Sequence, residues 1–165
     1  MSWQTADLCD LYRSQLQVAE PLFRAYGGLT QVEAPLVTVK LEQDNSILRT
    51  LLNQPGEGRA IAVDVGGNYC AVLGDIMADL AVKNGWKALL INGYIRDSAQ
   101  LKSMSLGVWA LGTCPMKSAK VAEGTTQVPL AFCGLAIKPG YFLYADDDGV
   151  LIASEQLHRT QGSQV

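Results

Sequence analysis

The sequence has little positive charge and no cluster of basic residues. Its 165 residues include 13 Lys and Arg against 16 Asp and Glu, which gives a formal net charge of −3. Lysines and arginines are scattered singly, and Lys117 and Lys120 come nearest to a pair. Because affinity for DNA or RNA depends on neutralising phosphates with Lys and Arg, we expect no direct nucleic-acid partner.

Long apolar runs and closely spaced cysteines are also absent. No segment approaches the roughly 18 apolar residues that a membrane span requires. Residues 1–10 show neither the basic nor the apolar region of a signal peptide. The four cysteines form no CxxC pair and stand far apart, at Cys9, Cys70, Cys114 and Cys133. We therefore expect a cytoplasmic protein with reduced thiols and no membrane attachment.

Several catalytic motifs are missing as well. The chain has no GxGxxG or Walker spacing, and Gly66-Gly67-Asn68 alone is a weak signal for phosphate binding, so methyltransferase activity is disfavoured. His158 is the single histidine and has no Ser, Cys or metal motif around it, which disfavours nucleophilic catalysis by a Ser-His pair. Residues 146–149 (DDDG) do not alternate as a calcium loop requires, so they predict a tight turn.

What is present is the composition of a globular protein, with 48% apolar and 18% charged residues. We expect a single domain over residues 1–155 and a polar tail over 156–165. Hydrophobic periodicity and cap residues predict helices over 7–14 (with Thr5 as its N-cap), 46–53, 76–84 and 98–103. Strands are predicted over 34–41, 59–65, 88–92, 107–112, 128–133, 141–145 and 150–153. This order is typical of a mixed α/β domain with a mostly β second half.

The helix over 76–84 has the clearest pattern. Gly74-Asp75 opens it and Gly85 is the expected C-terminal stop. Asp79 and Lys83 are spaced to pair on its solvent face. Its apolar residues form one stripe, namely Leu73, Ile76, Met77, Leu80 and Ala81.

The spacing between Asp75 and Arg96-Asp97 predicts a site. The intervening helix rises about 14 Å at ~1.5 Å per residue. The strand over 88–92 then returns about 16 Å at ~3.3 Å per residue. Because the two lengths nearly cancel, Arg96-Asp97 should lie beside the free N–H groups at the start of the helix. Two carboxylates, a guanidinium and several amides in one crevice can bind a small anion and a hard cation.

Each of these residues also has a purely structural interpretation. Asp at a helix start is most often an N-cap. Arg96-Asp97 could form a loop salt bridge in which Asp97 caps the next helix. The functional interpretation gains weight from position, because the pair follows the carboxyl end of a strand, where open α/β sheets bind their ligands.

Several separate motifs, in order, resemble the family of regulators of ribonuclease E activity, which also contains the class II 4-hydroxy-4-methyl-2-oxoglutarate aldolases. The resemblance runs over almost the whole chain, to Gly149. Its motifs are DLCD at 7–10, EPLF at 20–23, GDIMA at 74–78, NGYIRD at 92–97, LGV at 106–108, and YAD at 144–146 followed by Asp148-Gly149.

The resemblance implies a three-layer swivelling β/β/α fold and a ring-shaped homotrimer with active sites between subunits. It implies cleavage of 4-hydroxy-4-methyl-2-oxoglutarate into two pyruvates, with secondary oxaloacetate decarboxylase activity. In such enzymes the backbone of Gly74, Asp75, Ile76 and Met77 holds the pyruvate carboxylate, and Arg96 contacts the keto oxygen. Asp97 ligates a divalent metal, Mg²⁺ or Mn²⁺, and Asp75 orients one of its waters.

This chemistry suits the residues. Retro-aldol cleavage and decarboxylation both place negative charge on a pyruvate enolate oxygen, which a metal ion and a guanidinium stabilise as it develops. We place no lysine near the site, so a Schiff-base mechanism is disfavoured.

Two alternatives remain open. Family members that act as ribonuclease regulators can lack the acid after the arginine, whereas this chain has both Asp75 and Asp97, which favours an enzyme. A non-catalytic regulator that docks on a ribonuclease E-type protein is the first alternative. The second is an enzyme for another α-keto acid, because Ser98-Ala99-Gln100 offers no acid where many relatives carry one.

Overall fold

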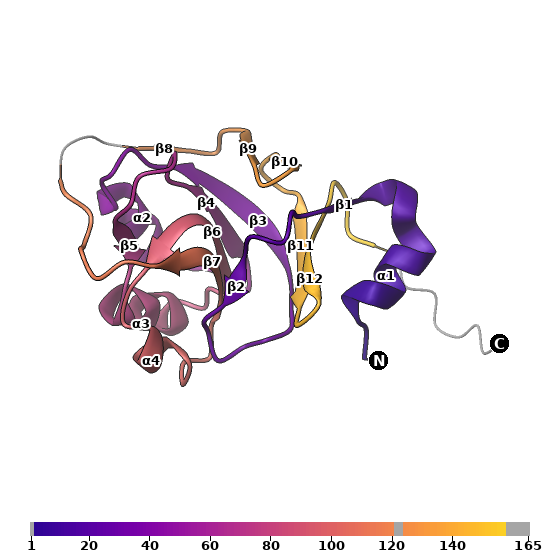
Figure 1. Ribbon diagram of the computed structural model, residues 1–165, viewed down its shortest axis with the longest axis horizontal. Helices are drawn as coiled ribbons and strands as arrows, with labels where there is room; N and C mark the ends of the chain where they lie inside the picture. Colours follow the sequence, from indigo (N-terminus) through magenta and orange to yellow (C-terminus); the bar gives the residue numbers. More distant parts are fainter. Residues whose placement is uncertain (1, 121–123, 158–165) are drawn as a thin grey trace.

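The computed structural model describes residues 2–120 and 124–157, and its centre is a mixed β-sheet (Figure 1). Four strands are parallel neighbours, in the order β3 (Val32–Lys40), β4 (Ala60–Asp64), β6 (Ala88–Ile95) and β7 (Gly107–Thr113). All of β4 and the first half of β6 are buried. Strands covered on both faces are continuous apolar runs, which is why this part of the sheet was predictable.

The long strand β3 joins this parallel sheet to an antiparallel one. Its first residues pair with β11 (Phe142–Asp146), and its last five pair with β4. Beyond β11 lie β12 (Gly149–Ala153) and β1 (Leu16–Val18), both antiparallel to their neighbours. Pro35, which has no N–H to donate, stands in β3 where the pairing changes from one sheet to the other.

Helices and antiparallel strands cover opposite faces of the parallel sheet, which confirms the expected three layers (Figure 1). One face packs against α2 (Ser46–Leu52), α3 (Asp75–Lys83) and α4 (Ser98–Leu101). The other packs against β11, β12 and a hairpin of β9 (Leu130–Phe132) and β10 (Leu135–Ile137).

The short strands were not predicted. Three of them add to larger strands: β2 (Arg24–Ala25) pairs with β7, β5 (Ala71–Leu73) with β6, and β8 (Thr125–Thr126) with β3. Two or three residues carry no measurable periodicity. The strand expected over 128–133 is present but shorter, as β9, because the chain reverses at Cys133-Gly134 and returns as β10, which was not predicted. Both residues have positive φ (48° and 75°), as a two-residue hairpin turn requires.

The first helix differs from its prediction because of a long-range contact. α1 (Thr5–Tyr12) begins two residues early and continues as a 3₁₀ turn, η1 (Arg13–Gln15). Thr5 does not cap it: its N–H and hydroxyl donate to the Asp146 carboxylate, over 2.7 and 2.6 Å. Asp146 also accepts the N–H of Asp148 over 3.0 Å, which confirms the tight turn between β11 and β12.

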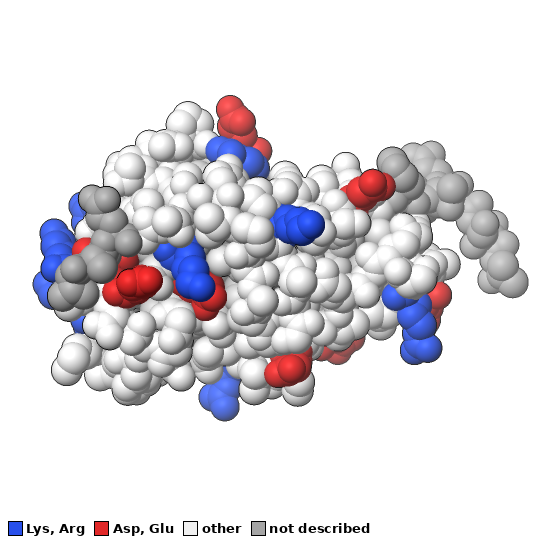
Figure 2. Space-filling view, turned by 90° about the horizontal axis from the view of Figure 1, so that it is seen from above, with Lys and Arg blue, Asp and Glu red and all other residues white. Residues whose placement is uncertain are grey.

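The end of the described chain is packed rather than free. Leu157 is 6% exposed, and its N–H donates to the Tyr144 hydroxyl over 2.9 Å, so this residue of the expected polar tail packs against the domain, and residues 158–165 of that tail lie outside the described residues. His158 lies outside the described residues. Within residues 2–120 and 124–157, every helix is too short or too polar to cross a membrane. On the face in Figure 2, acidic and basic side chains are interspersed over a largely uncharged surface.

Candidate active site

The N-terminus of α3 forms one side of the candidate site. The helix begins at Asp75 and is followed by Gly85, whose φ of 79° ends it, both as predicted. The solvent-face pair of Asp79 and Lys83 is also present, with Nζ and Oδ2 2.6 Å apart. The first N–H groups of a helix have no backbone partner within it. These donors lie where the sequence predicted them, and two of them are bonded to carboxylates: the Asp75 N–H to Asp97 and the Ile76 N–H to Asp75.

One residue of the expected apolar stripe is misplaced. Ile76 is 71% exposed, whereas Met77 beside it is buried. The first turn of α3 borders a cavity rather than the core, so Ile76 faces outward there.

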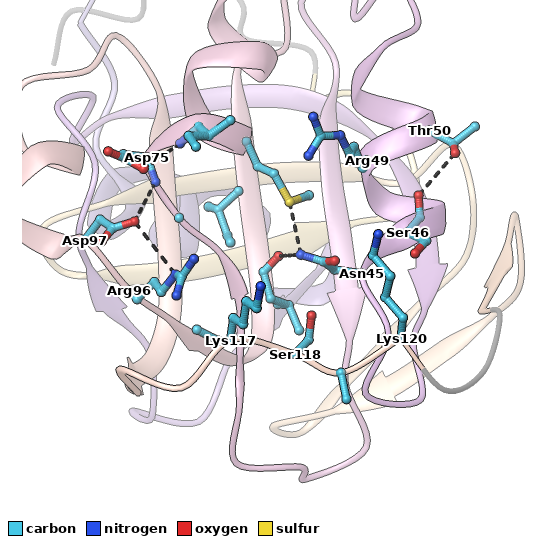
Figure 3. A pocket seen from close by; sticks show the side chains of 17 residues that line it. Asn45, Ser46, Arg49, Thr50, Asp75, Arg96, Asp97, Lys117, Ser118 and Lys120 are labelled. Atoms are coloured by element: carbon cyan, nitrogen blue, oxygen red, sulfur yellow. Dashed lines mark hydrogen bonds and ion pairs between the residues drawn. The ribbon is translucent and has the colours of Figure 1, made fainter.

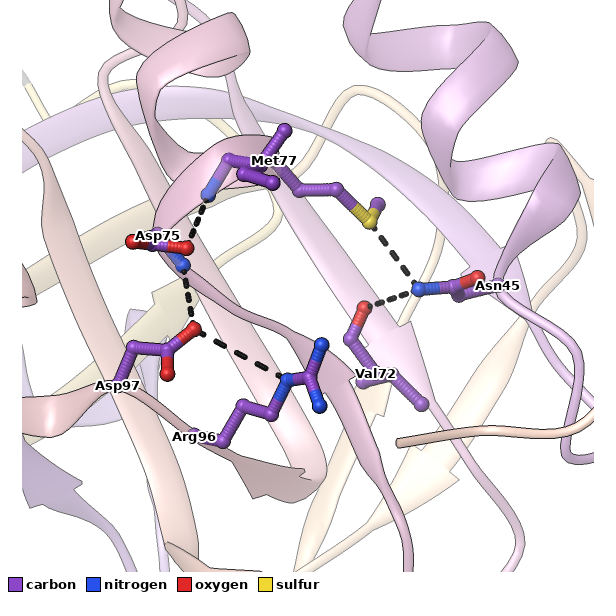
Figure 4. A network of polar contacts seen from close by, with 7 residues as sticks. Asn45, Val72, Asp75, Met77, Arg96 and Asp97 are labelled. Atoms are coloured by element: carbon purple, nitrogen blue, oxygen red, sulfur yellow. Dashed lines mark hydrogen bonds and ion pairs between the residues drawn. The ribbon is translucent and has the colours of Figure 1, made fainter. Parts of the chain in front are cut away.

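The second side comes from the end of β6. This strand runs to Ile95, three residues further than predicted, and Arg96-Asp97 follow it directly. The N–H of Asp75 donates to Oδ2 of Asp97 over 3.1 Å (Figure 4). The N–H of Arg96 donates to the Leu73 carbonyl over 3.0 Å. The predicted proximity of Asp75 and Arg96-Asp97 is therefore confirmed.

The Asp97 carboxylate does not cap α4. Asp97 precedes that helix but makes no side-chain cap bond to it, and its backbone is left-handed, with φ of 57°. Its Oδ2 lies 3.9 Å from Nε of Arg96, and the two side chains are 34% and 41% exposed. The interpretation of Asp97 as a helix cap is therefore wrong. Asp75 does bond locally, since its Oδ1 accepts the N–H of Ile76 over 2.8 Å.

Gly74 makes the approach of these groups possible. Its backbone is extended (φ −134°, ψ −169°), a conformation open to any residue. A Cβ at this position would stand only 2.6 Å from Oδ2 of Asp97 and 3.4 Å from Nε of Arg96. The absence of a side chain therefore lets Asp97 reach the start of α3.

A cavity of about 640 Å³ opens over this cluster. In Figure 3, Asp75 and Asp97 lie at one end, Arg49 and Lys120 at the other, and Lys117 between them. The expectation that no lysine lies near the site is wrong. The segment after β7 folds back beside β5. No local sequence pattern predicts that these two segments are neighbours.

Asn45 connects the start of α2 to β5 and α3, on the other side of the cavity. It precedes α2, and its Nδ2 donates to the Val72 carbonyl over 2.9 Å and contacts Sδ of Met77 at 3.1 Å (Figure 4). The preceding residue, Asp44, accepts hydrogen bonds from the hydroxyl and the N–H of Ser46. These bonds, with a smaller contribution from the charge of Lys120, hold the pKa of Asp44 below its usual value.

Comparison with known proteins identifies the family. The family model for RraA-like proteins, described as Aldolase/RraA, matches residues 5–152. The chain belongs to the RraA-like family.

Relatives of this RraA-like chain carry two kinds of name. "Putative 4-hydroxy-4-methyl-2-oxoglutarate aldolase" from Alkalilimnicola ehrlichii is 46% identical, covering 95% of this chain and 98% of the relative. One of the same name from Aromatoleum aromaticum is 44% identical, covering 95% and 99%. The solved structure of the RNA-processing inhibitor RraA from Thermus thermophilis matches with a TM-score of 0.91 at 34% identity, covering 98% of each chain.

A further solved relative has an unrelated name. It is a protein from Geobacillus kaustophilus described as an S-adenosylmethionine:2-dimethylmenaquinone methyltransferase, with a TM-score of 0.90 at 42% identity, covering 94% of this chain and 97% of that one. The RraA-like fold expected from the sequence is confirmed by the family model and by the match to RraA from Thermus thermophilis.

The acidic groups of this RraA-like site fit a hard cation held largely by water. No group of three or more His, Cys, Asp or Glu residues suited to a metal occurs in residues 2–120 and 124–157. Asp97 directs Oδ2 to the Asp75 N–H, and Asp75 directs Oδ1 to the Ile76 N–H. One oxygen of each carboxylate is left for a cation or its waters. Few carboxylates and many waters are typical of Mg²⁺ sites.

Sequence reasoning missed the opposite side of the cavity. Asn45, Arg49, Lys117 and Lys120 all line it. Lys117 and Lys120 were noted as the nearest approach to a basic pair, which was the available signal. Arg49 sits on the predicted helix 46–53, and its direction toward α3 depends on packing between elements far apart in the sequence.

Proposed function

We propose that this protein is a divalent-metal-dependent lyase that cleaves 4-hydroxy-4-methyl-2-oxoglutarate into two pyruvates, with oxaloacetate decarboxylation as a secondary activity. The observation that carries the proposal is the cluster of Arg96 and Asp97 at the N-terminus of α3, inside a cavity. The aldolase names of relatives at 44–46% identity support the same reaction.

The start of α3 binds the carboxylate of the α-keto acid in this proposal. Helix N-termini offer N–H donors and a favourable dipole to anions. The donors belong to Gly74, Asp75, Ile76 and Met77, and the Asp75 N–H, which donates to Asp97 in the structure, would be shared with the substrate carboxylate. In the structure the Ile76 N–H is bonded to the Asp75 side chain. An entering carboxylate would replace that bond and free the Asp75 carboxylate to orient a water molecule.

Arg96 stabilises the charge that forms during cleavage. When the bond between C3 and C4 breaks, the C4 hydroxyl gives its proton to water and becomes the carbonyl of one pyruvate, while the electron pair of the bond moves toward the keto group, so the keto oxygen gains enolate charge. Only Nε of Arg96 is directed at Asp97, at 3.9 Å, so its terminal N–H groups are available to the keto oxygen. A donor aimed at charge that develops in the transition state lowers the barrier directly.

Asp97 would hold the divalent cation, Mg²⁺ or Mn²⁺, through the carboxylate oxygen not bonded to Asp75. When bound, the cation supplies Lewis-acid stabilisation of the enolate charge. Lys117 lines the same cavity, but it is exposed. Lysines that form Schiff bases are usually activated by desolvation in an apolar pocket or by a nearby cation. Because Lys117 is exposed, it lacks such an apolar pocket. We therefore retain the metal-dependent mechanism.

The experiment that tests the function is pyruvate release from oxaloacetate by chelator-treated protein, with and without Mg²⁺ or Mn²⁺. Controls with metal but no protein are required, because metal ions by themselves accelerate the decay of oxaloacetate. Release that needs protein and metal together supports the proposal. Cleavage of 4-hydroxy-4-methyl-2-oxoglutarate is then measured under the same conditions. No release above the controls would contradict the proposal.

A second candidate function is regulation of a ribonuclease E-type protein without chemistry. The observation in its favour is the 34% identity to the RNA-processing inhibitor RraA. The two functions separate at Asp97, since a substitution there should remove enolate chemistry and spare docking. Calorimetry measures the binding of a purified ribonuclease E-type protein to the wild type and to the Asp97 variant, and equal binding by both would support the regulatory function.

We further propose that the protein assembles as a homotrimer with a neighbouring subunit beside the cavity. Three large apolar side chains are exposed: Ile76, which lines the cavity, at 71%, Met116, which precedes the cavity residue Lys117, at 72%, and Tyr69 at 66%. Burying such groups against another subunit is favourable by about 1.5–3 kcal/mol per side chain. Light scattering should give three times the mass of the chain, and a monomer would contradict the proposal.

A further inference from the structure

Strand β6 carries one extra residue relative to its neighbour β7, shortly before the candidate site. Ile91 pairs with Ala110 of β7. Tyr94, three residues further along β6, pairs with Gly112, which is only two residues further along β7. Because side chains alternate between the two faces of a strand, such a β-bulge changes the direction of the side chains that follow it. Those side chains include Arg96 and Asp97.

The bulge sets the register in which the end of β6 meets β5. Beyond it, Ile95 pairs with Leu73 of β5, and the Arg96 N–H donates to the Leu73 carbonyl over 3.0 Å. Leu73 leads directly into Gly74 and the start of α3. Without the extra residue, this part of β6 would shift by one position and its side chains would exchange faces. The contact between Asp97 and the start of α3 therefore depends on the bulge.

Asn92 stands in the bulge, and both polar atoms of its side chain are hydrogen-bonded. Its Nδ2 donates to Oδ1 of Asp64 at the end of β4 over 2.9 Å, and the same oxygen accepts the Gly66 N–H over 3.1 Å. Its Oδ1 accepts from Sγ of Cys133 over 3.5 Å. Burial, with a smaller effect of the Glu20 and Asp64 charges, raises the pKa of Cys133, so the thiol keeps its proton and can donate. Asn92 is therefore held from both sides.

These polar groups occupy positions where the sheet is otherwise apolar. Ala62 and Leu90, two residues earlier on the same strands, belong to the core between the parallel sheet and the antiparallel strands. By alternation Asp64 and Asn92 share that face, which is the one opposite the helices, and Asp64 is only 7% exposed. Burying a carboxylate and an amide is costly unless they bond to each other, and apolar side chains would pack there without that cost. A role in fixing the backbone explains why polar groups are present.

We propose that Asn92 and Asp64 are positioning residues of the candidate site. Their hydrogen bond fixes the bulge in β6 and thereby holds the Asp97 carboxylate at the Asp75 N–H. They act through the strand, from the face of the sheet opposite the helices. The consequence for activity rests on the proposed lyase function, whereas the consequence for the position of Asp97 does not.

The test is Asn92→Ala, which removes the donor to Asp64 and the acceptor for Cys133. The amide proton of Asp75, observed by NMR, reports its bond to Asp97, because hydrogen bonding to a carboxylate moves the resonance to higher frequency. We expect this resonance to move to lower frequency in the variant. The Kd of Mn²⁺, followed by electron paramagnetic resonance, should rise at least about 10-fold, as for loss of groups that orient metal ligands. A variant that is merely less stable would bind fewer Mn²⁺ ions with an unchanged Kd.

The matched control is Thr38→Val. Thr38 in β3 is fully buried, and its hydroxyl donates to the Val128 carbonyl over 2.6 Å. This variant also loses a buried hydrogen bond of the sheet, but away from the bulge. Its Asp75 resonance and its Mn²⁺ Kd should equal those of the wild type.

A double variant, Asp64→Leu with Asn92→Leu, decides the question if Asn92→Ala does not fold. Leucines continue the apolar face of Ala62 and Leu90, and replacing both partners of a buried hydrogen bond by apolar groups of similar shape is nearly neutral for stability. We expect it to fold and to show the same displaced Asp75 resonance. An unchanged Asp75 resonance in whichever variant folds would overturn the inference. If the wild type binds no Mn²⁺ and releases no pyruvate, the proposed function fails, and the Asp75 resonance still decides whether Asn92 and Asp64 position Asp97.

Discussion

The backbone N–H of Asp75 and the carboxylate of Asp97 are hydrogen-bonded over 3.1 Å, although 22 positions separate them in the chain. This bond joins the start of α3 to the end of β6. The Asp97 side chain is therefore oriented by a backbone N–H of α3 and not by a bond to α4, the helix that Asp97 precedes. A carboxylate held in this way is positioned for a ligand before the ligand arrives.

Replacing Asp97 by Asn should remove metal-dependent activity and preserve the fold. Asn also adopts left-handed backbone readily, as φ of 57° requires, and its side-chain oxygen can still accept the Asp75 N–H. Without the negative charge, metal-dependent release of pyruvate from oxaloacetate should fall at least about 100-fold, equivalent to about 2.7 kcal/mol. Binding of Mn²⁺, followed by electron paramagnetic resonance, should weaken in parallel.

The matched control for that variant is Asp79→Asn. Asp79 is an exposed acid on the helix α3 and forms an i,i+4 ion pair with Lys83, and such pairs contribute roughly 0.3–0.5 kcal/mol. Its activity and metal affinity should match the wild type. If Asp97→Asn bound Mn²⁺ as tightly as this control, Asp97 would not be the metal ligand.

Gly74→Ala should impair the site through crowding alone. The extended backbone at Gly74 accepts alanine, but the new Cβ would stand 2.6 Å from Oδ2 of Asp97 and push that carboxylate away. We expect kcat/KM to fall at least about 10-fold, since small misplacements of catalytic groups are costly, while thermal unfolding changes little.

Gly112→Ala provides the comparison for Gly74→Ala. A Cβ at Gly112 in β7 would meet only the Tyr94 ring, at 3.4 Å, which is ordinary contact. Its activity should stay within about twofold of the wild type, well inside the effect of a misplaced catalytic group. Equal activities of the two alanine variants would show that Asp97 adjusts without loss, against the proposed importance of its position.

Asp44 should contribute stability that depends on pH. Hydrogen bonds from Ser46 lower its pKa, so the ionised carboxylate is stabilised in the folded state. That contribution is complete above the ordinary Asp pKa of about 3.9 and disappears as the pH falls through the lowered value. Asp44→Asn should therefore lower Tm at pH 7, and the difference from the wild type should shrink as the pH approaches 2.

A second variant checks the cause of that pH dependence. Ser46→Ala removes the hydroxyl donor but leaves the backbone N–H bond to Asp44. It should reproduce part of the Asp44→Asn effect, with the same direction in Tm against pH. A constant Tm difference between wild type and Asp44→Asn across this range would show that the side chain acts by packing.

The central strands and α3 were predictable from sequence because local signals decide them. Buried runs such as β4 are apolar throughout, and α3 has both its opening Asp75 and its Gly85 stop. The close approach of Asp75 to Asp97 was predicted from element lengths, but β6 is three residues longer than that argument assumed. The approach is fixed instead by the pairing of Leu73 in β5, just before α3, with Ile95 at the end of β6.

The remaining features depend on contacts between distant segments. Thr5 bonds to Asp146, 141 positions away, instead of capping its helix. Lys117 reaches the cavity only because its segment pairs with Ala71. Neither partner is encoded in the neighbouring sequence, so periodicity and cap rules could not find them. The basic side of the cavity, formed by Arg49, Lys117 and Lys120, was missed for this reason.

The presence of Lys117 in the cavity makes the choice between metal and Schiff-base chemistry an experimental question with a definite expectation. A Schiff base would form between its amine and the keto group of pyruvate, and borohydride would reduce it to a stable adduct. Because Lys117 is exposed rather than desolvated, we expect no adduct in the mass spectrum of protein treated with pyruvate and borohydride. Activity should be abolished by chelation and restored by Mg²⁺. An adduct at Lys117 together with activity that survives chelation would instead assign catalysis to the lysine, and Asp97 would then serve only to hold Arg96 and the start of α3 in place.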